Sequence, residues 1–317
     1  MGRYEPINAL ESPRFSGLRT FARLPHVRDL AGVDVAVFGI PFDTATTFRT
    51  GARFGPAAVR EMSAMLRTYN PSLDVNVYDY LSVVDYGDLP TVPGYIEDTY
   101  DRVVAAMEPI LAANVFPIGI GGDHSVTLAE LRAIARRYGP VGFIQFDSHG
   151  DTWDEYFGRK YNHGTPFRRA VEEGLIDTSR AIQVGMRGSL YGPGDLQQSR
   201  DLGFELWTTD DVRREGLPAV LEAIRRRVGS GPVFLTFDID FVDPSFAPGT
   251  GTPEIGGFTS REAQELVRGL VGIDFVGMDL VEVLPAHDPS GITALIAANV
   301  IFEFLSVLAV NRRERAR

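Results

Sequence analysis

The chain has 317 residues, of which 44% are hydrophobic and 23% are charged, as in an ordinary globular protein. Its net charge of −11 argues against nucleic acid or an anionic membrane surface as a partner, because phosphate binding needs a basic surface. The absence of cysteine excludes disulfides and thiolate metal sites, so any bound metal would use His and carboxylate ligands.

Residues 1–30 are rich in Pro and Arg and are expected to form an irregular arm that lies on the domain or on a neighbouring subunit. After this arm, apolar runs alternate with segments of helical spacing. The predicted strands are 33–40, 81–84, 115–120, 141–146, 181–184, 204–207, 233–237 and 275–283. The predicted helices are 56–65, 96–112, 126–138, 166–173, 218–228, the segment from 259 to 270, which opens with a capping box, and 293–310.

This alternation predicts an α/β protein with one mostly parallel sheet and helices on both of its faces. No linker, repeat or low-complexity segment interrupts it, so residues 1–317 are expected to form a single domain. The N-terminus has no basic region followed by an apolar core, and no run of about 18 apolar residues occurs. We therefore expect a cytoplasmic protein that does not span a membrane.

Three predicted strands end in His and Asp residues. His124 follows strand 115–120, a group at 147–151 follows strand 141–146, and another pair follows strand 233–237. Because parallel strands end at the same edge of a sheet, these side chains are expected to converge there. The six candidate metal ligands are His124, Asp147, His149, Asp151, Asp238 and Asp240.

Four carboxylates packed together are stable only around positive charge. A single Asp after a strand is more often a helix cap or a turn residue, but six His and Asp residues together favour a metal site. Two divalent cations would supply the charge and would lower the pKa of a water molecule shared between them. Imidazole and carboxylate ligands without sulfur suit Mn²⁺ best, with Ni²⁺, Co²⁺ or Zn²⁺ as alternatives.

The motifs at these three strand ends resemble the signatures of the ureohydrolases, the arginase and agmatinase family. They are Gly-Gly-Asp-His-Ser at 121–125, Asp-Ser-His-Gly-Asp at 147–151, and the Asp-Ile-Asp run at 238–253 with its Pro-Gly-Thr-Gly-Thr-Pro ending. The similarity extends from Gly39 to Val283, over most of the chain. The resemblance implies a three-layer α/β/α sandwich, two Mn²⁺ ions, and hydrolysis of a guanidinium compound to urea and an amine.

The resemblance also implies roles for individual residues. One metal would be bound by His124, Asp147, Asp151 and Asp238, and the other by Asp147, His149, Asp238 and Asp240. His163 matches the proton-shuttling histidine and Glu282 the glutamate that orients the guanidinium; with Asp151 they form the predicted catalytic set. The family further implies a homotrimer or a homohexamer.

The substrate depends on the loops at 152–162, at 187–197 and around Phe48. Agmatine is the favoured expectation, with guanidinobutyrate, guanidinopropionate or another small guanidine as alternatives. Carboxylates for a distal ammonium would be Asp154, Glu155 or Asp195, and cations for a distal carboxylate would be Arg49, Arg159, Lys160 or Arg187. The expected substrate-binding residues are Trp153, Tyr156, Arg187 and Glu282.

Trp153 stands where arginases have an asparagine that contacts the amino-acid end of arginine, which argues against arginase itself. Trp153 and Tyr156 could instead form a wall of the pocket and limit the length of the substrate. Two other classes of function stay open at this point. They are a catalytically silent partner subunit and a protein that binds guanidines or polyamines without cleaving them.

Overall fold

The computed structural model describes residues 4–316, and its centre is an eight-stranded sheet. The strands lie in the order β4-β1-β5-β10-β9-β6-β7-β8, and all neighbouring pairs are parallel. Their bounds are β1 (Val35–Ile40), β4 (Val83–Asp88), β5 (Phe116–Gly121), β6 (Val141–Phe146), β7 (Ile176–Met186), β8 (Glu205–Thr208), β9 (Val233–Asp238) and β10 (Phe275–Val281). A separate antiparallel hairpin pairs β2 (Tyr69–Asn70) with β3 (Val75–Asn76).

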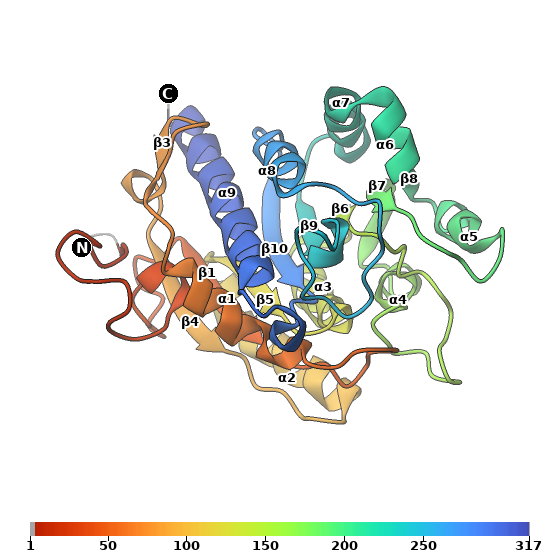
Figure 1. Ribbon diagram of the computed structural model, residues 1–317, viewed down its shortest axis with the longest axis horizontal. Helices are drawn as coiled ribbons and strands as arrows, with labels where there is room; N and C mark the ends of the chain where they lie inside the picture. The colour runs from red at the N-terminus through yellow and green to blue at the C-terminus, as the bar shows by residue number, and fades with distance from the viewer. Residues whose placement is uncertain (1–3, 317) are drawn as a thin grey trace.

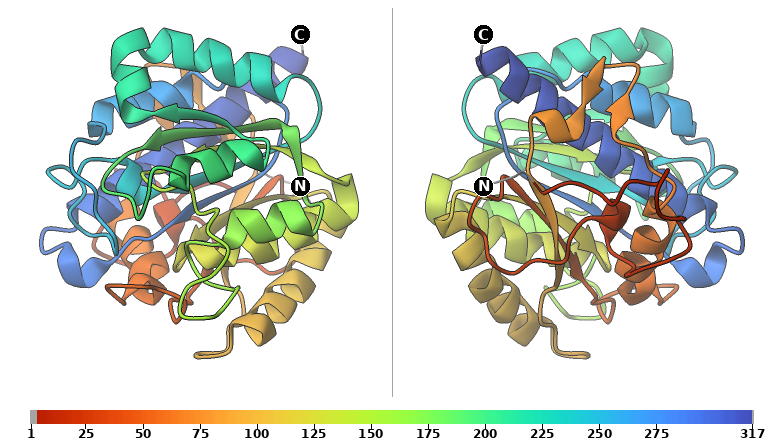
Figure 2. Two further views of the ribbon diagram at one scale, coloured as in Figure 1. Left: turned by 90° about the vertical axis from the view of Figure 1, so that its right-hand side faces the viewer. Right: turned by 90° about the vertical axis from the view of Figure 1, so that its left-hand side faces the viewer.

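Helices cover both faces of the sheet, as Figures 1 and 2 show. Side chains of α1, α6, α7, α8 and α9 pack on one face, and those of α2, α3 and α4 on the other. Their bounds are α1 (Gly55–Ser63), α2 (Ile96–Ala112), α3 (Thr127–Tyr138), α4 (Pro166–Glu172), α6 (Thr209–Glu215), α7 (Leu217–Val228), α8 (Ser260–Arg268) and α9 (Ile292–Arg315). The predicted α/β/α sandwich with a parallel sheet is therefore confirmed.

The continuous apolar strands result from this layering. Both faces of the central strands are covered by helices, so β1, β6 and β9 are buried at every residue and are mostly apolar. Helix α9 is long and apolar enough to cross a membrane by length and composition alone. However, 78% of its most apolar 18-residue window is buried inside the domain, as expected for a core helix.

The order of the strands brings distant parts of the chain together. The last strand, β10, lies between β5 and β9, and β6 lies on the other side of β9. The loops after β5, β10, β9 and β6 therefore emerge side by side at one edge of the sheet. Ligand sites of open α/β sheets form at this carboxyl edge.

The structure differs from the sequence prediction in several short elements. Strand β4 continues beyond its predicted end at residue 84 and includes Asp85, whose buried carboxylate pairs with Arg60 and accepts the Phe21 N–H group. Two short helices were not predicted, α5 (Asp195–Asp201) and α6. Each has seven residues that are mostly polar and show no apolar period, and α6 begins at a Thr208–Asp211 capping box.

The segment before β1 is mostly irregular but is not a loose arm. A single 3₁₀ turn at Phe21–Arg23 interrupts it, and Phe21 and Leu24 are buried in the core beside α1. The main chain there is fixed by the Phe21 N–H bond to Asp85 and by an Ala22 N–H bond to Ser63. Residues 20–24 thus pack on their own domain, while residues 1–3 lie outside the described part of the chain.

Candidate metal centre and active site

Four neighbouring strands deliver the candidate site residues to the carboxyl edge of the sheet. His124 follows β5, Glu282 follows β10, Asp238 ends β9, and Asp147 follows β6. All four side chains are at most 2% exposed. The site therefore lies on rigid, buried backbone at the centre of the sheet.

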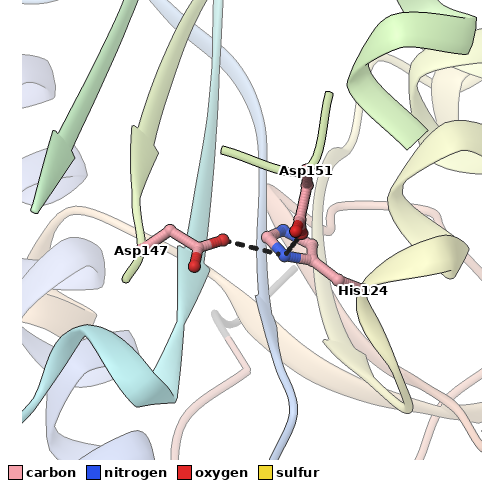
Figure 3. Close-up of side chains that lie close together, drawn as sticks. All are labelled: His124, Asp147 and Asp151. Carbon is pink, nitrogen blue, oxygen red and sulfur yellow. Dashed lines mark ion pairs between the residues drawn. The ribbon is translucent and has the colours of Figure 1, made fainter. Parts of the chain in front are cut away.

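The first group of ligand atoms surrounds the ring of His124, as Figure 3 shows for two of its partners. His124 Nδ1 lies 2.8 Å from Asp151 Oδ2, 3.1 Å from Asp147 Oδ2 and 3.3 Å from Asp238 Oδ2. Its other ring nitrogen, Nε2, lies 2.8 Å from the hydroxyl of Thr236. A single ring nitrogen thus faces three carboxylates.

The second group surrounds His149. Its Nδ1 lies 3.0 Å from Asp240 Oδ2 and 3.7 Å from Asp147 Oδ1. Asp147 therefore belongs to both groups, one oxygen facing each imidazole. All six residues predicted as ligands lie within these contacts, so the structure brings the whole predicted set together.

Burial and neighbouring carboxylates raise the pKa values of Asp147 and Asp238, whereas at Asp240 the neighbouring His149 outweighs burial and lowers the pKa of that carboxyl. Burial, followed by the charges of Asp240 and Asp151, raises the pKa of Asp147 to about 7. Burial and the neighbouring Asp240 and Asp147 hold the pKa of Asp238 well above its ordinary value. Burial alone would lower the pKa of His124, but its three carboxylate partners outweigh this effect and raise it. A divalent cation would relieve this repulsion.

Two buried atoms of the cluster support a cation as the missing partner. His124 Nδ1 and Asp240 Oδ2 lie close to their ion-pair partners, but within the described chain neither makes a hydrogen bond of good geometry. Buried polar atoms are nearly always satisfied in native proteins, so each of these atoms needs an explanation. Imidazole nitrogens and carboxylate oxygens in two groups that share Asp147 fit a pair of divalent cations.

Two site residues adopt the left-handed backbone conformation that favours glycine. Asp151 has φ 51° and Glu282 has φ 64°. Such conformations cost about 1–3 kcal/mol each and persist where surrounding contacts enforce them. Glu282 is held by its N–H bond of 2.9 Å to Gly122 O, at the start of the loop that carries His124. The backbone of two strand-end loops therefore aims the Glu282 carboxylate.

Glu282 joins the metal cluster to His163. Its Oε1 accepts the His124 N–H at 3.0 Å and lies 3.0 Å from His163 Nδ1. The opposite ring nitrogen, His163 Nε2, accepts the Thr47 N–H at 3.1 Å and lies 2.8 Å from the Thr47 hydroxyl. Since Nε2 accepts from the main chain, the proton of the neutral ring resides on Nδ1 and is donated to Glu282.

A cavity of about 550 Å³ opens beside the cluster and is lined by both charged and aromatic side chains. His149, Asp151, Asp238 and His163 lie among its lining residues. The others are Thr47, Phe48, Trp153, Tyr156, Phe157, Gly164, Ser189, Leu190, Tyr191, Thr252, Pro253 and Glu254. The cavity is large enough for a small organic molecule.

A comparison with known protein families gives one match that covers most of the chain. The model of the arginase family matches residues 33–306. The chain belongs to the arginase family. The ureohydrolase resemblance inferred from the three motifs is therefore confirmed, and the protein is an amidinohydrolase of that family.

Three relatives place the protein within the arginase family. It is similar to a guanidinopropionase of Pseudomonas aeruginosa, 47% identical over 96% of either chain. It is also similar to the proclavaminate amidino hydrolase structure of Streptomyces clavuligerus, with a TM-score of 0.91, 40% identity and coverage of 95% of this chain and 100% of that one. A Trypanosoma cruzi formiminoglutamase structure with Mn²⁺ has a TM-score of 0.82 at 27% identity, covering 92% and 98%.

The predicted substrate-binding residues of this arginase-family protein separate into two groups. Trp153 and Tyr156 line the cavity, and their rings lie 5.6 Å apart in an edge-on arrangement. Arg187 lies outside it, contrary to the sequence expectation that it faces the substrate. Its guanidinium donates to the main-chain oxygens of Asp240 at 2.6 Å and Glu254 at 2.8 Å. Arg187 thus fixes the loop after β9.

The charged residues proposed for the distal end of the substrate also lie outside the cavity lining. Asp154 pairs with Arg169 at 2.7 Å, and Asp195 accepts the Tyr191 N–H at 2.8 Å. The guanidinium of Arg49 stacks over Phe48. Glu155, Arg159 and Lys160 are exposed on the loop. None of these charges from the described chain lines the cavity beside the cluster.

Sequence reasoning missed three residues that bear on the site. Glu254 lines the cavity, and its carboxylate packs against the main chain at Gly188, where a Cβ would meet it at 2.2 Å. Thr47 holds His163, and Gln145 donates to Asp147 at 2.7 Å. Only Gln145 left a visible signal, as a polar residue within an otherwise apolar buried strand.

Proposed function

We propose that the protein hydrolyses a short linear guanidine compound to urea and an amine. The contacts of Glu282 carry this proposal. One carboxylate oxygen is engaged by His163 and by the His124 N–H, while Oε2 is buried with no hydrogen-bond partner in the described chain. A planar guanidinium offers paired N–H donors that match a carboxylate, so its binding would satisfy this oxygen. Glu282 would then hold the guanidinium beside the metal ligands.

Divalent metals bound by the two groups would supply Lewis-acid activation of the water that attacks the guanidinium carbon. The chain supplies the ligands, as described for His124, Asp147, His149, Asp151, Asp238 and Asp240. The leaving amine needs a proton, and His163 is placed to provide it. Burial would lower the pKa of His163, but its contact with Glu282 outweighs burial and leaves a net rise, which favours the protonated ring.

The metal in this proposal is Mn²⁺, with Ni²⁺ and Co²⁺ as alternatives. A site of carboxylates and two imidazoles without sulfur suits Mn²⁺. The related formiminoglutamase structure contains Mn²⁺ as well. Elemental analysis of the purified protein, followed by stripping and reloading with each metal in turn, tests this assignment. Mn²⁺ should restore the highest rate of urea release.

The proposed substrate is an ω-guanidino acid such as guanidinopropionate or guanidinobutyrate. This preference rests on the guanidinopropionase relative, which is 47% identical across nearly the whole chain, and it reverses the order expected from the motifs. Agmatine is the second candidate because of one observation. Glu254 is the carboxylate in the cavity lining outside the metal cluster, and no Lys or Arg of the described residues lines that cavity.

A urea-release assay across guanidinopropionate, guanidinobutyrate, agmatine, arginine and guanidine tests the proposal with each metal loaded. Urea should form fastest from one of the first two. Glu254→Gln should slow agmatine relative to the guanidino acids, because it removes a negative charge from the cavity. Metal loading without urea from any guanidine would overturn the proposal and favour a silent subunit or a binding protein.

We also propose that the protein assembles as a homotrimer or homohexamer, on the basis of its family resemblance. Closed rings of identical subunits are common among soluble oligomers. The apolar side chains of Leu10, Phe15 and Leu18 are each at least 77% exposed near the N-terminus, and contacts between subunits would cover them. Light scattering on the purified full-length protein measures its molar mass directly, and a monomer would exclude this proposal.

A further inference from the structure

A row of polar side chains crosses the buried sheet immediately behind the metal ligands. The strand register aligns Asp279 of β10 with Thr236 of β9, and Thr236 with Gln145 of β6. Two residues further along β9 and β6 lie the ligands Asp238 and Asp147. Since side chains alternate between the faces of a strand, the row and these ligands share one face. This is the face that α2, α3 and α4 cover.

Two members of the row contact metal ligands directly. Gln145 Nε2 donates to Asp147 Oδ2 at 2.7 Å. The Thr236 hydroxyl lies 2.8 Å from His124 Nε2, on the side of the ring that faces away from the carboxylates. Asp279 is completely buried and is the member of the row whose role these contacts leave open.

Asp279 is surrounded by groups that can donate a proton to it. Its Oδ2 accepts the Thr127 hydroxyl, while Oδ1 has no partner of good geometry in the described chain. Burial raises the pKa of Asp279, and the charge of the nearby His124, followed by the polar groups of Thr127, Thr236 and Glu130, opposes that rise. Glu130 is also fully buried, and burial together with Asp279 raises its pKa well above the ordinary value. The hydrogen bond from Thr127 makes Asp279 an acceptor within this group.

The hydroxyl of Thr236 has one hydrogen and two neighbours that could accept it. If it donates to Asp279, its oxygen accepts the Nε2–H of His124, and Nδ1 directs a lone pair at the carboxylate cluster. If it donates to His124 instead, Nε2 must be unprotonated and the ring proton sits on Nδ1. That proton would occupy the direction a cation needs, and the hydroxyl would have no hydrogen left to donate to Asp279 Oδ1, which has no other partner in the described chain.

We propose that Asp279 is a positioning residue of the metal centre, which accepts the Thr236 hydroxyl and thereby keeps His124 in the tautomer whose Nδ1 can bind a divalent cation. The inference rests on the metal centre of the proposed function, but it concerns affinity for the metal rather than the substrate. Partners behind a ligating histidine orient its ring and fix its tautomer in many metal sites. Here the partner acts through an intervening threonine.

Mn²⁺ affinity of the metal-stripped full-length protein, measured by competition with a chromophoric chelator, tests the proposal. Asp279→Asn should bind Mn²⁺ about 10–100-fold more weakly. The amide N–H of the new side chain can donate to Thr236 and so reverse the direction of the hydrogen bonds between this position, Thr236 and His124. Thr236→Val should weaken Mn²⁺ binding by a similar factor, whereas Thr236→Ser, which keeps the hydroxyl, should bind Mn²⁺ with the parent affinity. Glu130→Gln is the matched control, since it changes another buried carboxyl beside Asp279 that contacts neither Thr236 nor a metal ligand by a hydrogen bond, and its affinity for Mn²⁺ should stay at the parent value.

A double variant separates this role from a general loss of structure. If Asp279 acts through Thr236, adding Asp279→Asn to Thr236→Val should cause no further loss of affinity. The inference would be overturned if the two losses of affinity were additive. It would also be overturned if Asp279→Asn, with an unchanged circular dichroism spectrum, bound Mn²⁺ with the parent affinity; neither outcome would affect urea release by the parent protein. A parent protein that binds no Mn²⁺, Ni²⁺ or Co²⁺ would overturn the proposed metal centre as well.

Discussion

The floor and the mouth of the cavity are built from different kinds of structure. The floor carries the metal cluster, whose carboxylates sit at strand ends and are 5% exposed or less. The mouth is aromatic, and its Phe48, Phe157 and Tyr191 are between 69% and 82% exposed on loops. Strand-borne groups hold their geometry, whereas loops vary without disturbing the sheet. The reaction therefore depends on the floor and the choice of guanidine on the mouth.

Removing a metal ligand from the floor of the cavity should have the largest effect on urea release. Asp147→Ala removes the ligand shared by both groups, so it should abolish binding of the metal pair and lower urea release by about a thousandfold or more, since a catalytic metal contributes several kcal/mol. Elemental analysis and the urea assay measure the two effects. Asp101→Ala, an exposed substitution on α2, is the control. Two bound metals with near-normal turnover in Asp147→Ala would contradict the assignment.

A substitution of His163, which lies beside the metal ligands but is not one of them, should separate proton transfer from metal binding. His163→Asn removes the proposed proton donor but none of the ligands, so the metals should stay while kcat falls by about 10²–10⁴-fold. The measurement is kcat on the best substrate at saturating metal. Full turnover in this variant would remove His163 from the mechanism.

Altering the mouth should change selectivity more than rate. Tyr156 packs edge-on against Trp153 and lies 6.2 Å from the Tyr191 ring, so Tyr156→Ala opens this wall. The ratio of kcat/KM between a longer and a shorter guanidine should shift by about tenfold or more, the scale of a single methylene in a pocket. Metal content should remain at the parent level. An unchanged ratio would mean that Tyr156 does not limit substrate length.

The smallest effect concerns the metal-free protein and its pH dependence. The pKa values of Asp147 and Asp123 are raised from 3.8 to about 7, chiefly by burial. Between these values the folded state keeps protons that the unfolded state releases, so stability should fall as pH rises through this range. The Tm of stripped protein should drop by a few degrees, at about 2–4 °C per kcal/mol. Metal-loaded protein should show a flatter profile, and a rising Tm in stripped protein would refute the account.

Much of the floor could be predicted from the sequence because its signals are local. The strand at 141–146 and the helix at 96–112 were predicted with the bounds they have, and the Asp and His residues directly follow apolar strands. A polar residue at the carboxyl end of a strand lies at the same edge of a parallel sheet as the ends of the other strands. All six ligands are therefore expected at one edge of the sheet, and they converge because β5, β9 and β6 lie close together in the strand order.

The mouth could not be predicted in the same way. Arg187 looks like a residue for anion binding, but whether its guanidinium meets a substrate or main-chain oxygens depends on the path of the loop at Glu254. The partner of Asp154 is Arg169, on a helix whose position relative to the loop no sequence pattern gives. The Asp279–Thr236 alignment likewise follows from strand order, which sequence spacing does not reveal.

The central position of β10 has a consequence for how the molecule is made. This strand is synthesised last, yet it lies between β5 and β9 and joins the two halves of the sheet. While the ribosome is still translating residues 275–281, the His124 loop and the Asp238 loop have no common scaffold. The full set of ligands thus assembles only at the end of translation, and a nascent or C-terminally truncated chain would emerge without a competent metal site.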